Sequence, residues 1–517
     1  MSTEPRTEAR AVLAENREDY ALRPVPASYQ RWSVSSLFGV MFGITTAMFF
    51  FSWGGTLVHA YGTTNLVIGL VVATIIVGAL AYLWTSAASS SGLGSDLLTR
   101  GAGFGFLGSS VTSLIFAVNS LIFFAFEGAI MANAVMAQWP AIPAWLVYLV
   151  TGGVFIPLTW YGLRLVNILM WVTLPVFAVF ITLTIWQAAQ TSVQVDFWSY
   201  QPENGVDTVA GPPVLQLLAA AFGVAGTIPV AADFGRFIPA ERRRVGSFVV
   251  GPVFAAVTFL GPTLLGAWLS LRFAETDPGK YLPAVFGVGG VLFVITTQVR
   301  INLSNAYSGS LQFAGLFCRV FGVTPGRHWF VILTVGLGTV LMFGDLYSRL
   351  NAVLTFGGVF MLAWIACVVA DMTINKRLLR LSPPGFEYRR SQLPAFNPVG
   401  LGALGGALVV AVPLAFGLCG PLGMTLAPFV AAAVAFVLVP VLAAATKSRY
   451  YTARSSAHAV SVESLVECVV CGERHVSEDF VECPFHKGAV CSVCCASERA
   501  CRSLCKNENS DIERTLA

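Results

Sequence analysis

Long runs of apolar residues, separated by short polar loops, fill the chain from about residue 35 to residue 444. Each run is roughly 20 residues long, the length that a helix needs to cross the ~30 Å hydrocarbon core of a bilayer. A membrane barrel would instead show alternating segments of about 10 residues. We therefore predict an all-α membrane protein. Its twelve predicted spans are Ser35–His59, Leu66–Ser86, Phe106–Gln138, Ala144–Tyr161, Leu165–Ala188, Val214–Ala232, Phe248–Leu271, Tyr281–Phe317, Trp329–Gly344, Leu350–Val369, Gly400–Leu418 and Gly423–Ala444.

Two of the predicted spans are interrupted by glycines and polar residues at corresponding places. The first interruption is Gly39–Ala47, and the second is Phe222–Phe237 in the sixth span, with five spans from one to the next. Backbone groups freed by such breaks need a ligand, an ion or cavity water at membrane depth. Paired breaks are typical of a five-plus-five inverted repeat with a binding site near the midplane. The other interpretation is that glycine and proline are simply common in membrane helices.

Composition and charge fit this prediction and divide the chain. Of the 517 residues, 56% are hydrophobic and only 11% are charged, against about 25% charged in soluble proteins. The positive-inside rule then places both termini in the cytoplasm, in an inner or plasma membrane. We expect a cytoplasmic N-terminal segment without a signal peptide (1–31), a transmembrane transporter domain (32–446) and a cytoplasmic tail (447–517). The basic residues on alternate predicted loops are Arg100, Arg164, Arg242, Arg243, Arg244, Arg319, Arg327, Lys376, Arg377, Arg380, Arg389, Arg390, Lys447 and Arg449.

The tail holds eight of the eleven cysteines. Cysteines spaced by two residues can bind one tetrahedral metal together, and a reducing cytoplasm disfavours disulfides. We predict one or two structural zinc ions, with an iron–sulfur or redox centre as the alternative. Without metal the tail should not fold, and we expect it to dock a cytoplasmic protein partner or to regulate the bundle. The spacing does not fix which ligands share an ion. The candidate ligands are Cys468, Cys471, Cys483, His486, Cys491, Cys494, Cys495, Cys501 and Cys505.

Five short motifs add a family resemblance. They are EDYALRPVP (Glu18–Pro26), SWGGTL (Ser52–Leu57), GTIPVAADFGRFIP (Gly226–Pro239), NLSNAYSGSLQF (Asn302–Phe313) and VVAD (Val368–Asp371). In this order and spacing, over about residues 18–445, the chain resembles the nucleobase:cation symporter family, in its purine and cytosine permease branch. The resemblance implies a twelve-helix bundle, alternating access, and a planar heterocycle held at the midplane.

The resemblance also implies substrate contacts. Phe123 holds the position of a ring-stacking aromatic residue, and Glu127 holds that of an amide-like group one helical turn later. Asn302 matches a substrate-contacting amide. The second stacking position is Thr227, which departs from the family and leaves Phe123, Phe124 or Phe222 to compensate. The glycines of the two interrupted spans, Gly43 and Gly226, complete the candidate substrate contacts.

Glu127 is the sharpest of these signals. An ionisable group at membrane depth costs about 3 kcal/mol or more and usually faces a cavity or a partner. It could accept the N–H donors of a heterocycle or carry a coupled proton. The alternative for Glu127 is that it stays protonated and forms a hydrogen bond to a neighbouring helix. The alternative for Phe123 is that its ring only packs against lipid or other helices.

Ion coupling is expected to differ from that of relatives, which often place sodium-binding hydroxyls just before the position of Asn302. This chain has Arg300 and Ile301 there, and a fixed guanidinium could replace the cation. Transport driven by protons, or uncoupled, is therefore favoured, although a different register would let Thr296 and Thr297 bind sodium. Asp233 and Arg236 are either an inner gate or an ordinary helix-end pair.

We therefore predict a secondary active transporter for a nucleobase or related heterocycle, such as cytosine or a purine, that is proton-coupled rather than sodium-coupled. No phosphate-binding loop, hydrolase elbow or acid–base cluster occurs in the predicted spans, so we do not expect an enzyme. The net charge of +4 gives no indication of a nucleic-acid partner. The alternative is a membrane-embedded ligand receptor that signals through the cysteine-rich tail, and net flux of ligand would separate the two.

Overall fold

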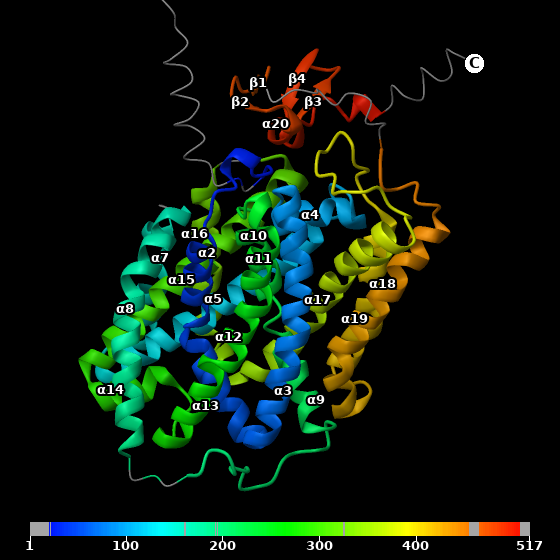
Figure 1. Ribbon diagram of the computed structural model, residues 1–517. Helices are drawn as coiled ribbons and strands as arrows, with labels where there is room; N and C mark the ends of the chain where they lie inside the picture. The colour runs from blue at the N-terminus through cyan, green and yellow to red at the C-terminus, as the bar shows by residue number, and fades with distance from the viewer. Residues whose placement is uncertain are drawn as a thin grey trace, which may run out of the picture.

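The computed structural model describes residues 20, 22–159, 162–191, 193, 195–323, 326–453 and 465–506. Most of these residues form a bundle of helices, and the small cysteine-rich tail caps one end of it (Figure 1). Arg23, ahead of the first long helix, lies 3.9 Å from Asp479 of the tail. Both ends of the described chain therefore lie at the same end of the bundle, which we call the tail end.

The helices of the bundle are bounded as follows. They are α2 (Val34–Thr45), α3 (Met48–Ser91), α4 (Ser95–Thr99), α5 (Ser110–Gln138), α6 (Ala144–Gly153), α7 (Phe155–Thr159), α8 (Gly162–Ala189), α9 (Pro213–Phe222), α10 (Thr227–Gly235), α11 (Arg243–Phe248), α12 (Phe254–Leu260), α13 (Pro262–Phe273), α14 (Pro278–Phe286), α15 (Val288–Phe321), α16 (Arg327–Phe343), α17 (Leu350–Ala370), α18 (Pro398–Ala415) and α19 (Gly420–Ala445). Short 3-10 or π turns are η1 (Ala27–Tyr29), η2 (Arg100–Phe104), η3 (Ala240–Arg242), η4 (Val249–Val253), η5 (Leu346–Arg349) and η6 (Asp371–Leu378).

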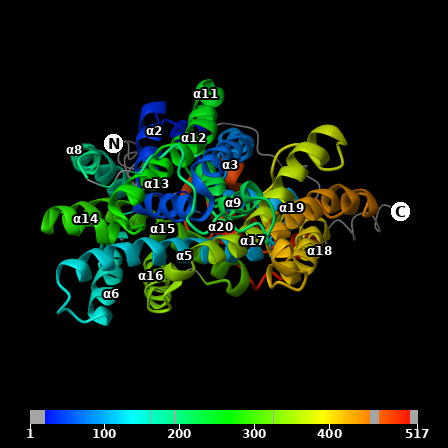
Figure 2. The ribbon, with the colours of Figure 1, turned by 90° about the horizontal axis from the view of Figure 1, so that it is seen from below.

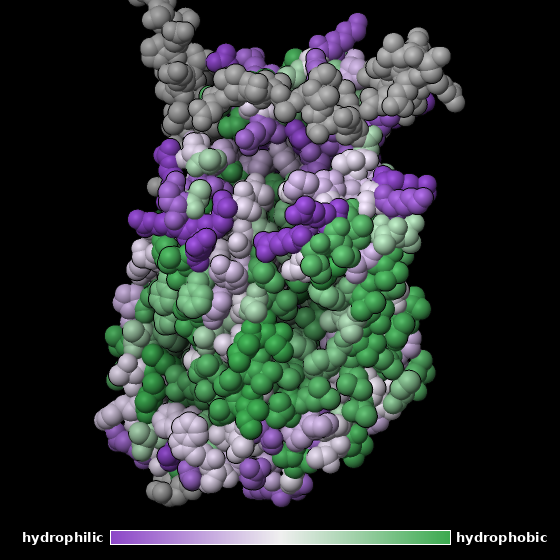
Figure 3. Space-filling model, turned by 45° about the vertical axis from the view of Figure 1, so that its right-hand side comes forward, coloured by the Kyte–Doolittle hydropathy of each residue, from purple (hydrophilic) through white to green (hydrophobic). Residues whose placement is uncertain are grey.

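A belt of apolar side chains lies between more polar ends of the molecule, as one face shows in Figure 3. Seven described helices are long and apolar enough to cross a membrane, and α9 with α10, bent by 43°, would make an eighth. The prediction of an all-α membrane protein is confirmed. The predicted count of twelve does not follow from these helices, because several are short and α15 carries buried arginines.

The helix α3 shows why spans and helices differ in number. It is 44 residues long and covers the second half of the first predicted span and all of the second. Gly62 lies at the turn between these parts with φ 73°, a backbone conformation that favours glycine. A Cβ there would lie 2.8 Å from the end of the Gln201 side chain, which would have to move aside.

Both predicted interruptions are real breaks. Helix α2 ends at Thr45 and α3 begins at Met48, with Ala47 in an extended conformation between them. In the sixth predicted span, α9 and α10 are separated by residues 223–226. Residues from both breaks line one cavity, described below.

The helices around the breaks form the centre of the bundle. Helix α5 packs along α15, and α3 packs against α9, α10, α12 and α13. Seen from below, α17, α18 and α19 lie together at one side, away from α8 and α14 (Figure 2). The breaks are therefore enclosed by helices that come from distant parts of the chain.

The tail consists of two short hairpins and a helix. Strands β1 (Leu465–Glu467) and β2 (Arg474–Val476) pair antiparallel, as do β3 (Phe480–Cys483) and β4 (Gly488–Cys491). Helix α20 (Ser492–Ser497) follows β4 directly, and the 3-10 turns η7 (Ser477–Asp479) and η8 (Leu504–Lys506) complete the tail. Phe480 and Val490 form its small apolar core together with buried cysteines.

Candidate substrate and metal sites

A small cavity lies where the two helix breaks meet α5 and α15. Its volume is about 60 Å³, enough for several waters. The cavity is therefore small in this conformation. Its lining residues are Ile44, Phe49, Phe50, Phe116, Asn119, Ser120, Phe123, Glu127, Val224, Gly226, Thr227, Val230, Ile301, Ser304, Asn305 and Ser308.

Glu127 is the ionisable side chain among these described lining residues, and it is 1% exposed. Its Oε2 accepts a hydrogen bond from the backbone N–H of Phe49 (3.2 Å), in the first turn of α3. The same oxygen accepts a bond from the side-chain amide of Gln298 (2.5 Å). Glu127 on α5 thus caps the free end of the second half of a broken helix, a place that favours a negative charge.

Gln298 on α15 completes this cap. Its Oε1 accepts a hydrogen bond from the Met48 N–H (3.2 Å), and its amide nitrogen also donates to the Glu127 backbone carbonyl (3.0 Å). The first two N–H groups of α3 are therefore held by Gln298 and Glu127. Our sequence analysis did not identify Gln298, although an amide in the apolar stretch LFVITTQV was a visible signal.

Arg300 lies on the other side of the same break and is 1% exposed. Its guanidinium donates to the hydroxyls of Thr46 (2.5 Å) and Thr173 (3.3 Å). It also lies 5.6 Å from the centre of the Phe177 ring, within the range of a cation–π contact. A permanent positive charge is therefore held against Thr46, the residue that follows α2.

The aromatic wall of the cavity comes from α3 and α5. The half-buried Phe123 packs edge-on against Phe49 with ring centres 5.0 Å apart. Phe49 also stacks with Phe126 at 5.8 Å. Phe123 therefore faces the cavity as part of a cluster of packed aromatic rings. Phe49 and Phe50 also line the cavity, and the sequence did not indicate them.

Of the remaining predicted substrate contacts, some line the cavity and others only join neighbouring helices. Gly226 and Thr227 line the cavity, and the Thr227 hydroxyl donates to the Val224 carbonyl (3.0 Å). A Cβ at Gly226 would lie 2.4 Å from the Asn119 side chain, so this approach needs glycine.

Asn302 and Gly43 are not part of the lining. Asn302 donates to the Phe124 carbonyl (3.1 Å) and joins α15 to α5. Asn305, one turn later, lines the cavity and donates to Asn302 (3.2 Å). Gly43 is buried in α2 and its carbonyl accepts a bond from the Thr46 hydroxyl (2.9 Å).

The predicted gate residues lie at the tail end of α10. Asp233 accepts a hydrogen bond from the Ser95 N–H (2.7 Å). Arg236 donates to the Tyr20 carbonyl (2.7 Å), which ties the N-terminal segment to α10. Both side chains approach Gly94. Asp233 and Arg236 therefore join α10 to two other segments at this end.

Asp96, Arg100 and Arg319 form a buried ionic cluster nearby that the sequence analysis did not predict. Asp96 is paired with Arg100 (3.0 Å) and with Arg319 at the end of α15. Arg100 also donates to the Tyr388 carbonyl (3.3 Å). We expected Arg100 and Arg319 on loops as topology signals, but both are buried at helix ends because Asp96 and nearby hydroxyls satisfy them.

Four of the predicted metal ligands come together in the tail. The sulfurs of Cys468, Cys471, Cys491 and Cys494 all lie within 4.8 Å of one another, and sulfurs of a tetrahedral zinc site are about 3.8 Å apart. The Cys491 N–H donates to the Cys468 sulfur (3.3 Å). The hydrogen bond between Cys491 and Cys494 lowers the pKa of the Cys491 thiol and raises the pKa of the Cys494 thiol. These residues could hold a metal ion.

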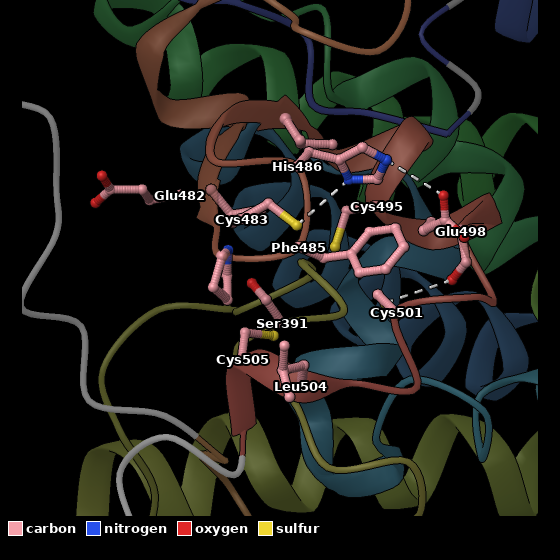
Figure 4. A pocket seen from close by; sticks show the side chains of 13 residues that line it. Ser391, Glu482, Cys483, Phe485, His486, Cys495, Glu498, Cys501, Leu504 and Cys505 are labelled. Carbon is pink, nitrogen blue, oxygen red and sulfur yellow. Dashed lines mark hydrogen bonds and ion pairs between the residues drawn. The ribbon is translucent and has the colours of Figure 1, made fainter. Parts of the chain in front are cut away.

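The other five predicted ligands line a separate cavity in the tail (Figure 4). Cys483 and His486 lie on one side of it, and α20 and the segment after it supply the thiols. These ligands are Cys483, His486, Cys495, Cys501 and Cys505.

The tail is fastened to the bundle through the loop before α18. Tyr388 donates to the Glu478 carbonyl (3.1 Å). Arg390 donates to the backbone carbonyls of Cys495 (3.0 Å) and Glu498. Arg499 of the tail donates to the Arg319 carbonyl at the end of α15. The tail therefore contacts the transmembrane bundle at more than one element.

An α-helical bundle with two broken helices around a central cavity is the architecture of a secondary transporter. The structure is similar to that of Mhp1, a nucleobase-cation-symport-1 family transporter, in a closed conformation with bromovinylhydantoin bound. The TM-score is 0.62 with 18% identity, over 83% of this chain and 98% of that one. The inward-facing conformation of Mhp1 matches with a TM-score of 0.60 and 17% identity, over 82% of this chain and 93% of that one.

A third solved structure has the same architecture. A Na+-coupled sialic acid symporter in a substrate-bound outward-open state matches with a TM-score of 0.57 and 13% identity, over 84% of this chain and 94% of that one. No protein-family model and no curated protein matches the sequence. The chain thus has the fold of these cation symporters.

Proposed function

We propose that the protein is a secondary transporter that carries a nucleobase or related small heterocycle by alternating access. The carrying observation is the small cavity at the junction of the two helix breaks, lined by Phe123, Glu127 and Asn305. Its aromatic wall suits a planar ring, and its amides can donate and accept at a ring edge. The sequence resemblance and the similarity to Mhp1 support the same substrate class.

The small size of the cavity also supports alternating access. A volume of about 60 Å³ leaves room for a few waters rather than for a bound heterocycle. Binding therefore requires the half-helices to move apart. The caps at Met48 and Phe49 place the movable end of α3 in direct contact with α5 and α15, so a change at Glu127 is transmitted to the break.

We propose that Glu127 carries the coupled proton and that Arg300 takes the place of a sodium ion. Protonation would remove the charge that favours the start of α3, which connects proton binding to the shape of the break. Arg300 already supplies a positive charge beside Thr46, and a guanidinium stays charged. Asp233 and Arg236 are proposed as part of the gate at the tail end, because they bind two neighbouring segments.

Zinc is the metal that we propose for the centre at Cys468, Cys471, Cys491 and Cys494. Four cysteines in two C-x2-C pairs are typical of a structural zinc site. An iron–sulfur cluster would use the same ligands, and absorption spectroscopy of the purified protein would distinguish the two.

Uptake into vesicles that contain the purified protein tests the proposed function. Labelled cytosine, adenine, uracil and hydantoin are offered under an imposed proton or sodium gradient, with Glu127→Gln as the variant. We expect accumulation of at least one compound that is driven by protons and lost in Glu127→Gln. Saturable binding without accumulation would instead favour the receptor that signals through the tail.

A further inference from the structure

The second tail cavity, between β3, β4 and the segment after α20, is lined by one imidazole and four thiols. Its volume is about 20 Å³, which leaves room for a water-sized particle. The donors are Cys483, His486 and Cys495, which are drawn near one another, and Cys501 and Cys505, which lie further from Cys483 (Figure 4). Thiol sulfur and imidazole nitrogen are ligands that zinc prefers, so the lining has the chemistry of a metal site. Cys483 and His486 already lie close together, and the other thiols have to move closer when an ion binds.

The geometry of Cys483 and His486 fits two ligands of one ion. The Cys483 sulfur lies 3.5 Å from His486 Nδ1. Two ligands of a tetrahedral zinc ion, with Zn–S near 2.3 Å and Zn–N near 2.1 Å, would lie about 3.6 Å apart. The two side chains therefore already have the separation that a shared zinc ion requires.

The other nitrogen of His486 has the support that metal-binding histidines usually show. His486 Nε2 lies 3.4 Å from the Glu498 carboxylate (Figure 4). A carboxylate at this position fixes the ring and directs the opposite nitrogen toward the metal. Arg390 in turn donates to the Glu498 carbonyl, so this segment is held in place by the bundle.

The first metal centre does not use these five residues, so they are available to bind another ion. It uses Cys468 and Cys471 together with Cys491 and Cys494. Cys495 follows Cys494 on α20, and adjacent helical residues point about 100° apart, so Cys495 faces a different region. The two ligand sets thus alternate along the chain, with Cys483 and His486 between the two halves of the first centre.

We propose that the tail binds a second metal ion, of the zinc class, through Cys483, His486 and two of the thiols from Cys495, Cys501 and Cys505. This ion joins the β3–β4 hairpin to the segment that follows α20, whereas the first joins β1 and β2 to the start of α20. The proposal does not depend on what the bundle transports.

The test is the zinc content of the full-length protein in detergent after loading and dialysis, with cobalt(II) loading as a second readout. We expect two ions per chain in the wild type and in Cys419→Ser, a cysteine outside the tail. The double variant Cys483→Ser/His486→Ala should hold one ion, and its thiolate-to-cobalt absorption should fall to roughly half to two thirds of the wild-type value.

His486→Cys separates a ligand role from a folding role. A thiolate can replace the imidazole as a ligand, so this variant should keep two ions even if the double variant loses both by unfolding. One ion in the wild type, two ions in the double variant, or one ion in His486→Cys would overturn the proposal.

Discussion

Replacing Glu127 by alanine should release the start of α3, and the structure sets the size of the effect. The Phe49 N–H loses its acceptor, and the Gln298 amide loses one of two. An unsatisfied buried donor costs about 1–3 kcal/mol, and the loss of the helix N-cap is the loss of this same hydrogen bond. We therefore expect Glu127→Ala to lower the free energy of unfolding by about 1–3 kcal/mol.

Glu127→Gln should behave differently because its amide oxygen remains an acceptor at the same position. It loses the charge but keeps the hydrogen bond to Phe49, so the expected loss is about 1 kcal/mol or less. Ser308→Ala is the matched control, since Ser308 lines the same cavity from α15. Ser308→Ala removes a hydroxyl but leaves the cap of α3 in place, so its expected loss is about 1 kcal/mol or less.

The measurement is reversible unfolding of the purified protein in mixed micelles, followed by tryptophan fluorescence. The order of stability expected is wild type, then Ser308→Ala and Glu127→Gln, then Glu127→Ala by a clear margin. If Glu127→Ala lost no more stability than Ser308→Ala, the cap on α3 would not be a stabilising contact and the reasoning would be refuted. Equal losses in Glu127→Ala and Glu127→Gln would show that charge, rather than the acceptor, matters.

Three further predictions concern the proposed cation and the tail. Arg300→Ser should make ligand binding sodium-dependent, because it removes the fixed charge beside Thr46 and adds a hydroxyl, and equal affinity in sodium and choline would contradict this. Arg390→Ala should raise the rate of hydrogen exchange in residues 480–506 by about tenfold or more, because a hydrogen bond from a charged group contributes about 1.5–3 kcal/mol. Lys487→Ala, at an exposed position of the tail, is the control and should leave the rate unchanged. A strong zinc chelator should increase exchange in the tail while the helices keep their protection, and a cooperative loss of both would argue against separate stability.

The bundle and its breaks could be predicted because hydrophobic length and glycine placement are local signals. The segments around Gly43 and Gly226 were recognised in this way. Glu127 was found because a carboxyl group is costly at membrane depth. Gln298 was missed because its role depends on how α15 packs against α3 and α5, which periodicity does not specify. For the same reason the sequence did not distinguish the lining residue Asn305 from the interhelical contact of Asn302.

The tail shows the same limit at a smaller scale. The spacing of cysteines indicated metal but allowed many pairings. The structure groups Cys468 and Cys471 with Cys491 and Cys494 because the two pairs meet at the end of the β3–β4 hairpin. That meeting depends on a strand register that three- or four-residue strands do not reveal in sequence. Composition could therefore identify the chemistry of the tail, whereas the hairpin decides which ligands share an ion.

The placement of the tail bears on the choice between transport and signalling. Its fastening is mostly through partly buried arginine contacts to backbone carbonyls, as Arg390 shows. Such contacts do not depend on the partner's side chain and suit a permanent attachment. The tail also touches the segment before α2 through Arg23, and the end of α15 through Arg499. In alternating access one repeat rocks against the other, so a module fixed to both elements restrains that motion. These contacts favour a tail that sets the balance between transporter conformations over one that reports ligand binding to a separate partner.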